Sequence, residues 1–466
     1  MSRERSPGMK LLLAGLVAAV LIVPLAMVYA LVYDRENQSD LAQAQIAAGW
    51  GGVQVVAGPL LVIPYRETIV ETETVHGQQR EIRREVKREL FVAPASQQVE
   101  TAIDPDRKAY AIYESVVYHA DMAGSANFTL AEELERLGLA REDLLLGKAE
   151  LRFGISDPRG LTDGARVTVN GEAAQLVPGN GPNATGSAGF SAAIEWDGER
   201  PLQIGWEYGL RGSRSLAMVP SGGDTAWQVT SPWPHPSFAG TLPDEREVTS
   251  DGFTAIYSGI TNLALGQQLV SLSDPGANYG SDSATHEAAM VERHVANSNS
   301  TASPVSIGLV DPVDLYSQVD RAVKYGFLFI GFTFGTFLMF DVVGGARVAS
   351  AEYLLTGAGL ILFFVMLLAF AEIIGFAAAY VVAAAAIIGL LTAYSAAVLG
   401  TWRRAGLIAA MLAALYALLF VLLNMETYAL VIGSLLLFAG LAGIMYATRN
   451  VDWSAVRKET ARSEVA

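Results

Sequence analysis

The 466-residue chain contains no cysteine and only five histidines. The missing thiols exclude disulfide bonds, thiolate metal sites and a cysteine nucleophile. There is also no G-x-S-x-G serine elbow, no H-E-x-x-H zinc motif and no phosphate-binding loop ending in Lys-Ser/Thr. His286 and His294 lie eight residues apart beside Glu287 and Glu292, but their polar surroundings favour a solvated loop over a metal site. We therefore expect a non-enzymatic protein without metal or cofactor.

Charged residues are scarce as well, at 17% of the chain against 52% hydrophobic residues. A soluble domain carries about a quarter charged residues. The first apolar block, 11–33, is uncharged and long enough to cross a bilayer. It ends in Leu31, Val32 and Tyr33 rather than in a small-residue cleavage site, which favours an uncleaved anchor over a signal peptide. Five further spans are predicted at 325–343, 353–371, 373–395, 405–423 and 428–446, with a tight hairpin after Glu372.

The distribution of basic residues predicts the orientation of these six spans. Lys and Arg flank the spans on one side only, which should be the cytoplasmic side. The short loops on the other side carry Glu372 and Glu426. The basic residues that set this prediction are Arg3, Arg5, Lys10, Arg347, Arg403, Arg404, Arg449, Arg457, Lys458 and Arg462. Both termini should therefore be cytoplasmic, and residues 34–322 should be periplasmic.

The exported region is acidic and rich in strand signals. It has 21 Lys and Arg against 39 Asp and Glu, which argues against binding to nucleic acid. Residues 37–48 should extend span 1 as a helical stalk, and 52–65 should form a buried strand. We expect a long exposed hairpin over 66–92, with a charged helix as the alternative for its second arm. Further strands are expected at 110–122, 149–156, 165–177, 190–196, 202–210 and 225–233, and one helix at 130–145.

The predicted fold is an α-helical transmembrane bundle of six spans, with a large, mainly-β, sandwich-like exported domain inserted between span 1 and span 2. Residues 271–303 read as a polar insertion within that domain. The domain limits are 1–36 for the cytoplasmic N-terminus and anchor, 37–322 for the periplasmic domain, 323–453 for the five-span bundle and 454–466 for the cytoplasmic tail.

The stretch TSPWPHPSFAGTLP, residues 230–243, combines three closely spaced prolines with Trp233, His235 and Phe238. Proline fixes φ and removes a hydrogen-bond donor, so the stretch should leave a strand and not pair as one. We expect Trp233 and Phe238 to pack against the domain, and His235 to be partly available to a ligand. These three residues form the candidate ligand or partner surface. Trp233→Ala should therefore lower the stability of the exported domain by roughly 3 kcal/mol or more, as deletions of buried aromatic rings do.

Asp341, Glu372 and Glu426 are the candidate polar residues of the bundle. Their places near span ends favour helix capping or loop solvation over function. A transporter would need polar groups deep in the spans, and it would bring Glu372 and Glu426 together. Spans 3 to 6 instead offer mostly Ala, Leu, Gly and Ile, which suit close helix packing.

Several segments, in order and at matching spacing, resemble the bacterial inner membrane protein CreD family. They are GPLLVIPY (58–65), IYESVVY (112–118), LRGSRSL (210–216), SPWPHPSFAGTLP (231–243), DPVDLYSQVDRAVKYGFLFIGFTF (311–334), YLLTGAGLILFFVMLLAFAE (353–372), METYALVIGSLLLF (425–438) and MYATRNVDW (445–453). The chain departs from the family at 349–352, where His-Pro-x-Gln is usual, at 371–373, where Ser-Glu-His is usual, and at Asp341, where Glu is usual.

The resemblance implies an inner membrane protein linked to cell-envelope integrity, to a two-component envelope or catabolic response and to tolerance of colicins and β-lactams. It implies no established enzymatic activity. We expect a sensing, binding or scaffolding role for the periplasmic domain, with the lipid bilayer and envelope proteins or cell-wall components as partners. The alternative is a transporter or lipid-handling protein with a periplasmic gate. A hydrolase that uses His235 is a third and weaker hypothesis. The oligomeric state stays open.

Overall fold

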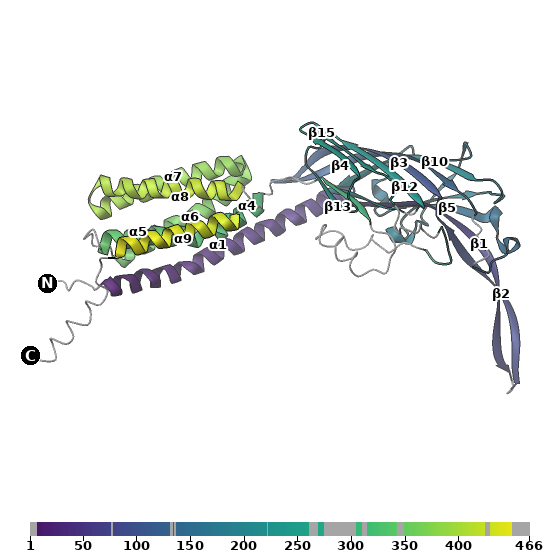
Figure 1. Ribbon diagram of the computed structural model, residues 1–466, viewed down its shortest axis with the longest axis horizontal. Helices are drawn as coiled ribbons and strands as arrows, with labels where there is room; N and C mark the ends of the chain where they lie inside the picture. Colours follow the sequence, from purple (N-terminus) through teal and green to yellow (C-terminus); the bar gives the residue numbers. More distant parts are fainter. Residues whose placement is uncertain are drawn as a thin grey trace, which may run out of the picture. The chain divides into compact units, whose positions relative to one another are not determined.

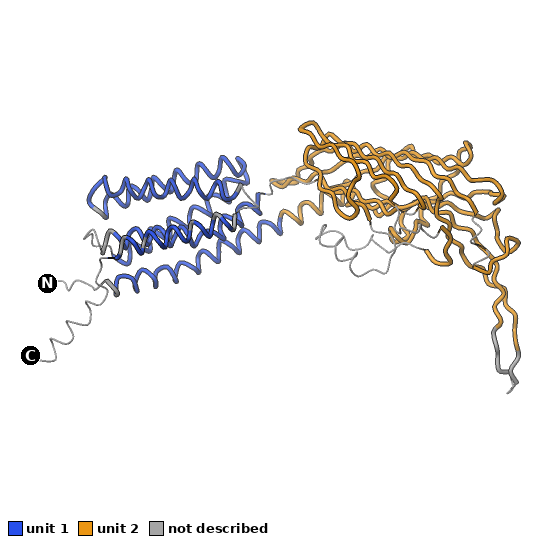
Figure 2. The backbone as a smooth tube through the Cα atoms, in the orientation of Figure 1, with its two compact units in different colours: residues 1–38, 313–466 blue, residues 39–312 orange. Residues whose placement is uncertain are grey.

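The structure is a computed structural model that describes residues 7–75, 78–130, 134, 137–220, 222–260, 269–274, 304–309, 315–342, 349–424 and 429–449. It divides into two compact units (Figure 2). One comprises Met1–Gln38 and Val313–Ala466, and the other comprises Ser39–Pro312. The predicted tail 454–466, the candidate residue Glu426, the histidine pair His286 and His294, and residues 275–303 of the polar insertion lie outside the described residues.

Helix α1 (Pro7–Trp50) continues the first apolar block into the polar segment that follows it. The predicted helical stalk is therefore confirmed. The helix ends two residues later than expected, because the chain turns at Gly51, whose φ of 148° lies outside the helical region.

The described residues of the second unit form 17 strands in two sheets (Figure 1). Their bounds are β1 Gln54–Val75, β2 Gln78–Val92, β3 Ser96–Tyr110, β4 Tyr113–Phe128, β5 Ala149–Ile155, β6 Arg166–Val169, β7 Glu172–Ala173, β8 Leu176–Pro178, β9 Gly189–Ile194, β10 Leu202–Ser213, β11 Ser215–Val219, β12 Asp224–Ser231, β13 Pro236–Gly240, β14 Glu245–Thr249, β15 Gly252–Tyr257, β16 Val270–Ser271 and β17 Val305–Leu309.

The nine-stranded sheet has the order β13-β17-β11-β1-β5-β9-β8, with β2 paired to β1 and β16. The eight-stranded sheet has the order β14-β15-β12-β3-β4-β10-β6-β7. The two sheets share one apolar core. Phe153 of β5 meets Trp206 of β10 at 5.9 Å between ring centroids, and Phe190 of β9 meets Tyr208 of β10 at 5.8 Å. The predicted two-layer β region is confirmed.

Side-chain alternation places every second residue of a strand in this core. On β3, Val99, Thr101 and Ile103 are buried, while Glu100 and Ala102 face outward. The same period of two runs along β10. One face of the eight-stranded sheet therefore closes the core, and the other face presents polar side chains.

The long hairpin predicted over 66–92 is confirmed in its described residues, except that its root at Leu90, Phe91 and Val92 is buried rather than exposed. β1 and β2 pair antiparallel from Leu61↔Val92 to Val75↔Gln78. The charged helix considered for the second arm is wrong, because Gln78–Val92 pairs as a strand; its apolar residues Ile82, Val86 and Leu90, four apart, lie on one face of that strand.

Three other local predictions need correction. The stretch 110–122 is not one strand: it turns between β3 and β4, where Ala111 has a positive φ of 57°. The stretch 165–177 is divided by a turn at Asn170 and Gly171, so that β6 and β7 form a small hairpin. The helix predicted over 130–145 does not reach residue 145, because Gly138 has a positive φ of 68° and Arg141–Asp143 form a short 3₁₀ turn; Leu134 is helical, and residues 131–133 and 135–136 lie outside the described residues.

The first unit contains, besides α1, the helices α4 Leu315–Lys324, α5 Gly326–Val342, α6 Ser350–Ile374, α7 Phe376–Leu399, α8 Trp402–Asn424 and α9 Ala429–Thr448. The tight hairpin after Glu372 is confirmed, since Gly375 alone separates α6 from α7 and adopts a positive φ of 77°. Aromatic rings pack between the helices: Phe363 lies 4.6 Å from Tyr416 and 5.3 Å from Tyr380. The Tyr380 hydroxyl donates to the Tyr416 carbonyl at 2.7 Å.

Five helices in the described part of the chain are long and apolar enough to cross a membrane, not the six expected. They cover Met9–Trp50, Leu315–Met339, Ser350–Ile374, Phe376–Val398 and Trp402–Leu423. The sixth predicted span, 428–446, coincides with α9. Its described apolar stretch, Gly433–Gly443, is shorter than the roughly 20 residues that a spanning helix needs.

Candidate functional site

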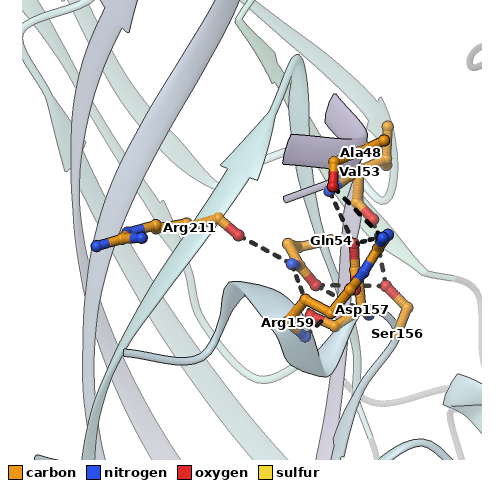
Figure 3. Close-up of polar contacts among 8 residues, drawn as sticks. Ala48, Val53, Gln54, Ser156, Asp157, Arg159 and Arg211 are labelled. Carbon is orange, nitrogen blue, oxygen red and sulfur yellow. Dashed lines mark hydrogen bonds and ion pairs between the residues drawn. The ribbon is translucent and has the colours of Figure 1, made fainter. Parts of the chain in front are cut away.

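A buried polar cluster fixes the end of α1 to the β unit, and Gln54 lies at its centre (Figure 3). Gln54 is the first residue of β1 and has no exposed surface. Its Nε2 amide donates to the carbonyl oxygens of Asp157 at 3.1 Å and Arg211 at 2.9 Å. Its Oε1 accepts the backbone N–H of Asp157 at 3.2 Å. One side chain therefore joins β1 to the turn after β5 and to β10.

Asp157 and Arg159 close this cluster on the helix side. The Arg159 guanidinium donates to both carboxylate oxygens of Asp157, each at 2.8 Å, and also reaches the Ala48 carbonyl in the last turn of α1 at 3.4 Å. Asp157 in turn accepts the Gly52 backbone N–H at 3.0 Å. A cation at a helix C-terminus satisfies free carbonyls and suits the helix dipole, so this pair stabilises the end of α1.

Trp50, the last residue of α1, is held by cations and by the backbone. The Arg211 guanidinium lies 4.9 Å from its ring centroid and the Lys108 ammonium lies 5.0 Å from it. Its indole N–H donates to the Tyr118 carbonyl at 3.2 Å. Gly51 then passes so close to β10 that an added Cβ would stand 2.6 Å from the Arg211 carbonyl oxygen. Only glycine fits there, both for space and for its positive φ.

The Arg159 guanidinium holds the pKa of Asp157 below its ordinary value of 3.8, even though partial burial acts in the opposite direction. A carboxyl group whose pKa is lower in the folded state stabilises the fold above its unfolded pKa, and that contribution disappears as the pH falls through the folded pKa. We therefore expect Asp157→Asn to melt at a lower temperature than the parent at pH 7. The difference should shrink below roughly pH 4, as the parent carboxylate becomes protonated.

Scanning calorimetry of the full chain in detergent between pH 7 and pH 3 would measure this. The control is Asp104→Asn on the outer face of β3, which should show a small and nearly constant difference. A difference between Asp157→Asn and the parent that stays constant through acid pH would contradict the assignment.

A polar groove of about 470 Å³ lies on the outer face of the eight-stranded sheet. The groove is hollow because the small residues Ala102, Ala123 and Gly209 lie on neighbouring strands, where larger side chains would fill the surface. Strand pairing aligns the lining in two rows. The first is Thr230, Ala102, Asp121 and Gly209, and the second is Gln228, Glu100, Ala123, Glu207 and Arg166.

The charge of the groove is predominantly negative. Four carboxylates line it, from Glu100, Asp121, Asp163 and Glu207. The Arg166 guanidinium offsets one of them at 3.7 Å from Glu207, and the His119 ring lies 3.1 Å from the Asp121 carboxylate. The described residues contain no group of three or more His, Asp or Glu arranged to hold a metal ion. Such a surface suits hydroxyl and ammonium groups of a ligand better than anions.

The predicted surface of Trp233, His235 and Phe238 lies where the chain crosses between the two sheets. β12 ends at Ser231 in one sheet, and β13 starts at Pro236 in the other. The expectation that the stretch would not pair as a strand is wrong for 236–240, which pairs with β17. Proline is tolerated there because it is the first residue of an edge strand.

The aromatic residues of this crossing pack against the core from its margin. Trp233 and Phe238 are half-buried, and Phe238 meets Phe253 at 5.9 Å. The full cost of deleting a buried aromatic therefore does not apply to Trp233. His235 is exposed, and its carbonyl accepts the Trp233 indole N–H at 3.1 Å. None of the three residues lines the groove.

The candidate residues of the bundle do not form one described site. Asp341 lies in the last turn of α5, and Glu426 lies outside the described residues, so the predicted convergence of Glu372 with Glu426 stays a prediction. Glu372 near the end of α6 has a side chain only 12% exposed. It accepts the Tyr316 hydroxyl at 3.3 Å and stands 3.9 Å from the Arg35 guanidinium. These contacts join α6 to α4 and α1, which favours a structural role.

Sequence reasoning missed the two polar sites of the β unit. The sequence held one indication of the groove: His119 and Asp121 lie two residues apart, and residues two apart on a strand share a face. Nothing in the sequence indicated the cluster around Gln54, since Asp157 and Arg211 are more than 100 residues away from it in the chain.

The sequence profile of the CreD inner membrane protein family matches residues 6–454. The curated inner membrane protein CreD of Escherichia coli (strain K12) is 30% identical over 443 residues, which cover 94% of this chain and 91% of that protein.

Likenesses to solved structures are weak. An M1 zinc metallopeptidase from Deinococcus radiodurans matches 37% of this chain and 39% of its own, at 10% identity and a TM-score of 0.23. A protease-like structure from Parabacteroides distasonis matches 60% and 59% of the two chains, at 8% identity and a TM-score of 0.19. Superpositions this poor carry no argument about fold or activity.

Proposed function

Because the chain belongs to the CreD family of inner membrane proteins, we propose that it serves the cell envelope without enzymatic chemistry, as a binding or sensing protein in envelope integrity or stress response. The ligand site is the groove of the eight-stranded sheet. The ligand class is an envelope component that carries amine groups, such as a cell-wall peptide.

The groove is the observation that supports this function best. It is concave, it is lined by convergent polar groups from five neighbouring strands, and its carboxylates outnumber its cations. Ionised acceptors form the strongest hydrogen bonds with ammonium donors. The strands that carry them belong to a closed two-sheet core, so the side chains stand on a rigid surface.

We extend the proposal to the topology of the chain in the inner membrane. Both termini are cytoplasmic and residues 34–322 periplasmic in this proposal, which requires that α9, 20 residues long although its apolar stretch Gly433–Gly443 is shorter, also crosses the membrane. The one-sided distribution of Lys and Arg supports this orientation. The chain lacks cysteine, so single cysteines can report it. An impermeant maleimide should label Tyr110→Cys in intact spheroplasts and Ala466→Cys only after lysis. The reverse pattern would refute the orientation.

The groove is tested with trilysine as the probe, by titration calorimetry on the full chain in detergent. Neutralising two lining carboxylates in the variant Glu100→Gln/Glu207→Gln should weaken binding about two- to thirtyfold, since exposed charge pairs contribute roughly 0.2–1 kcal/mol each. The matched control is Glu245→Gln/Glu247→Gln on β14, which is exposed and outside the groove. Equal weakening in both variants, or no binding by the parent chain, would overturn the groove as the site.

A further inference from the structure

The distal part of the β1–β2 hairpin extends beyond both sheets as a two-stranded ribbon (Figure 1). Near its root the hairpin is built into the nine-stranded sheet. β1 pairs with β5 as far as Val62 and bridges Leu144 through Tyr65, and β2 pairs with β16 at Phe91 and Val92. Past these residues, β1 from 66 and β2 up to 88 pair only with each other among the described strands.

Such a ribbon leaves a row of backbone donors and acceptors open on each of its two outer edges. An isolated two-stranded hairpin is marginally stable in water, because it has neither a third strand nor a packed face. This ribbon also exposes apolar side chains, with Val70 54% and Ile82 39% exposed. Its length and exposure therefore point to a partner at its edges.

The two edges differ in charge. Residues 66–75 of β1 contain one Arg and three Glu, whereas residues 78–88 of β2 contain five Arg or Lys and two Glu. Among the described side chains of the hairpin, the ion pairs Arg66 with Glu85 and Arg88 with Glu67 lie at its proximal end and involve well-exposed side chains. Toward the tip, Arg83 and Arg84 stand opposite the apolar Val70 and Ile69. Their charge remains available to a neighbouring strand.

We propose that the ribbon pairs edge to edge with the ribbon of a second copy of this chain, with acidic β1 of one copy beside basic β2 of the next. Where two such ribbons point the same way, β1 of one copy beside β2 of the other runs antiparallel and brings opposite charges together. β1 beside β1, or β2 beside β2, runs parallel and sets like charges against each other. This inference is independent of the proposed ligand groove.

Cysteine crosslinking of the full chain in its own membrane tests this pairing. Two differently tagged copies are co-expressed, one with Val70→Cys on β1 and the other with Ile82→Cys on β2. Because the parent has no cysteine, a product of a short bismaleimide crosslinker that has twice the mass of the chain and carries both tags joins the two engineered copies. We expect a mixed dimer in clear excess over the like-strand dimers formed when either variant is expressed alone. Equal yields of mixed and like-strand dimers, or no crosslink, would overturn the proposal.

A charge swap provides the matched control. Arg83→Glu/Arg84→Glu, added to the β2 copy, should reduce the mixed dimer about fivefold. Adding Glu71→Lys/Glu73→Lys to the β1 copy should then restore it. Arg83 and Arg84 stand opposite apolar residues in their own hairpin, so the change falls mainly on the contact between copies. If the second pair of substitutions leaves the yield low, charge complementarity does not select the partner and the proposal fails.

Discussion

Replacing Trp227 with alanine is expected to lower the free energy of unfolding of the β unit by about 4 kcal/mol. Trp227 on β12 is fully buried, and its ring stacks on Tyr257 of β15 at 5.5 Å between centroids. Its indole N–H donates to the Thr101 hydroxyl on β3 at 2.9 Å. Alanine would leave a large cavity and an unpaired buried hydroxyl, and both effects destabilise the folded state.

Scanning calorimetry of the full chain in detergent should show this as a drop of roughly 10 °C in the melting temperature of the β unit. Trp227→Phe keeps an aromatic ring and loses the hydrogen bond, so it should fall between the parent and alanine. Tyr110→Ala, at a 53% exposed position on β3, controls for loss of an aromatic ring from the same sheet. If the β unit of Trp227→Ala melts at the same temperature as that of the parent, this part of the core does not limit stability.

The helices and strands that could be predicted are those whose own residues show a hydropathy pattern or a glycine break. The Thr- and Val-rich run at 69–75 and the apolar residues Ile82, Val86 and Leu90, four apart, are visible along the chain and indicated the hairpin. Helix α1 was predictable for the same reason, since an apolar run leads into a polar helical segment and the break comes at glycine. The Gly375 turn between α6 and α7 is likewise marked by one residue in a long apolar sequence.

Elements set by distant contacts were not predictable in this way. The turn at Ala111 interrupts a run of strand formers without Gly, Asn or Pro, so nothing nearby marks the positive φ that β3 and β4 impose. Prolines between 232 and 236 correctly indicated a stiff exit from β12. They could not indicate that the chain enters the other sheet, because that depends on β17, about 70 residues later.

Both polar sites of the β unit depend on sheet order. Glu100, Asp121 and Glu207 come together because β3, β4 and β10 are neighbours in one sheet. The sequence shows that each strand alternates, but not which strands lie side by side. A polar outer face could therefore be predicted from the sequence, whereas a hollow made by Ala102, Ala123 and Gly209 could not.

Replacing Gln54 with leucine is expected to lower the stability of the β unit by about 3 kcal/mol. Leucine fills a similar volume but has no amide. The Asp157 and Arg211 carbonyls would lose the Nε2 donor, and the Asp157 N–H would lose its acceptor, all in a site without exposed surface. Leaving a buried polar group unpaired costs roughly 1–3 kcal/mol. The loss exceeds that of one hydrogen bond because a single side chain serves three backbone groups.

The effect should also be local, because Gln54 follows the end of α1 by four residues. In the leucine variant, limited proteolysis of the full chain should cut at 49–53 much faster than in the parent, since the clamp between Asp157, Arg159 and the Ala48 carbonyl depends on the same turn. Gln203→Leu, at an exposed position on β10, is the matched control and should change neither the melting temperature nor the cleavage rate appreciably. Faster cleavage elsewhere with 49–53 still protected would place the weakness outside this junction, and Gln54 would then be an ordinary core residue.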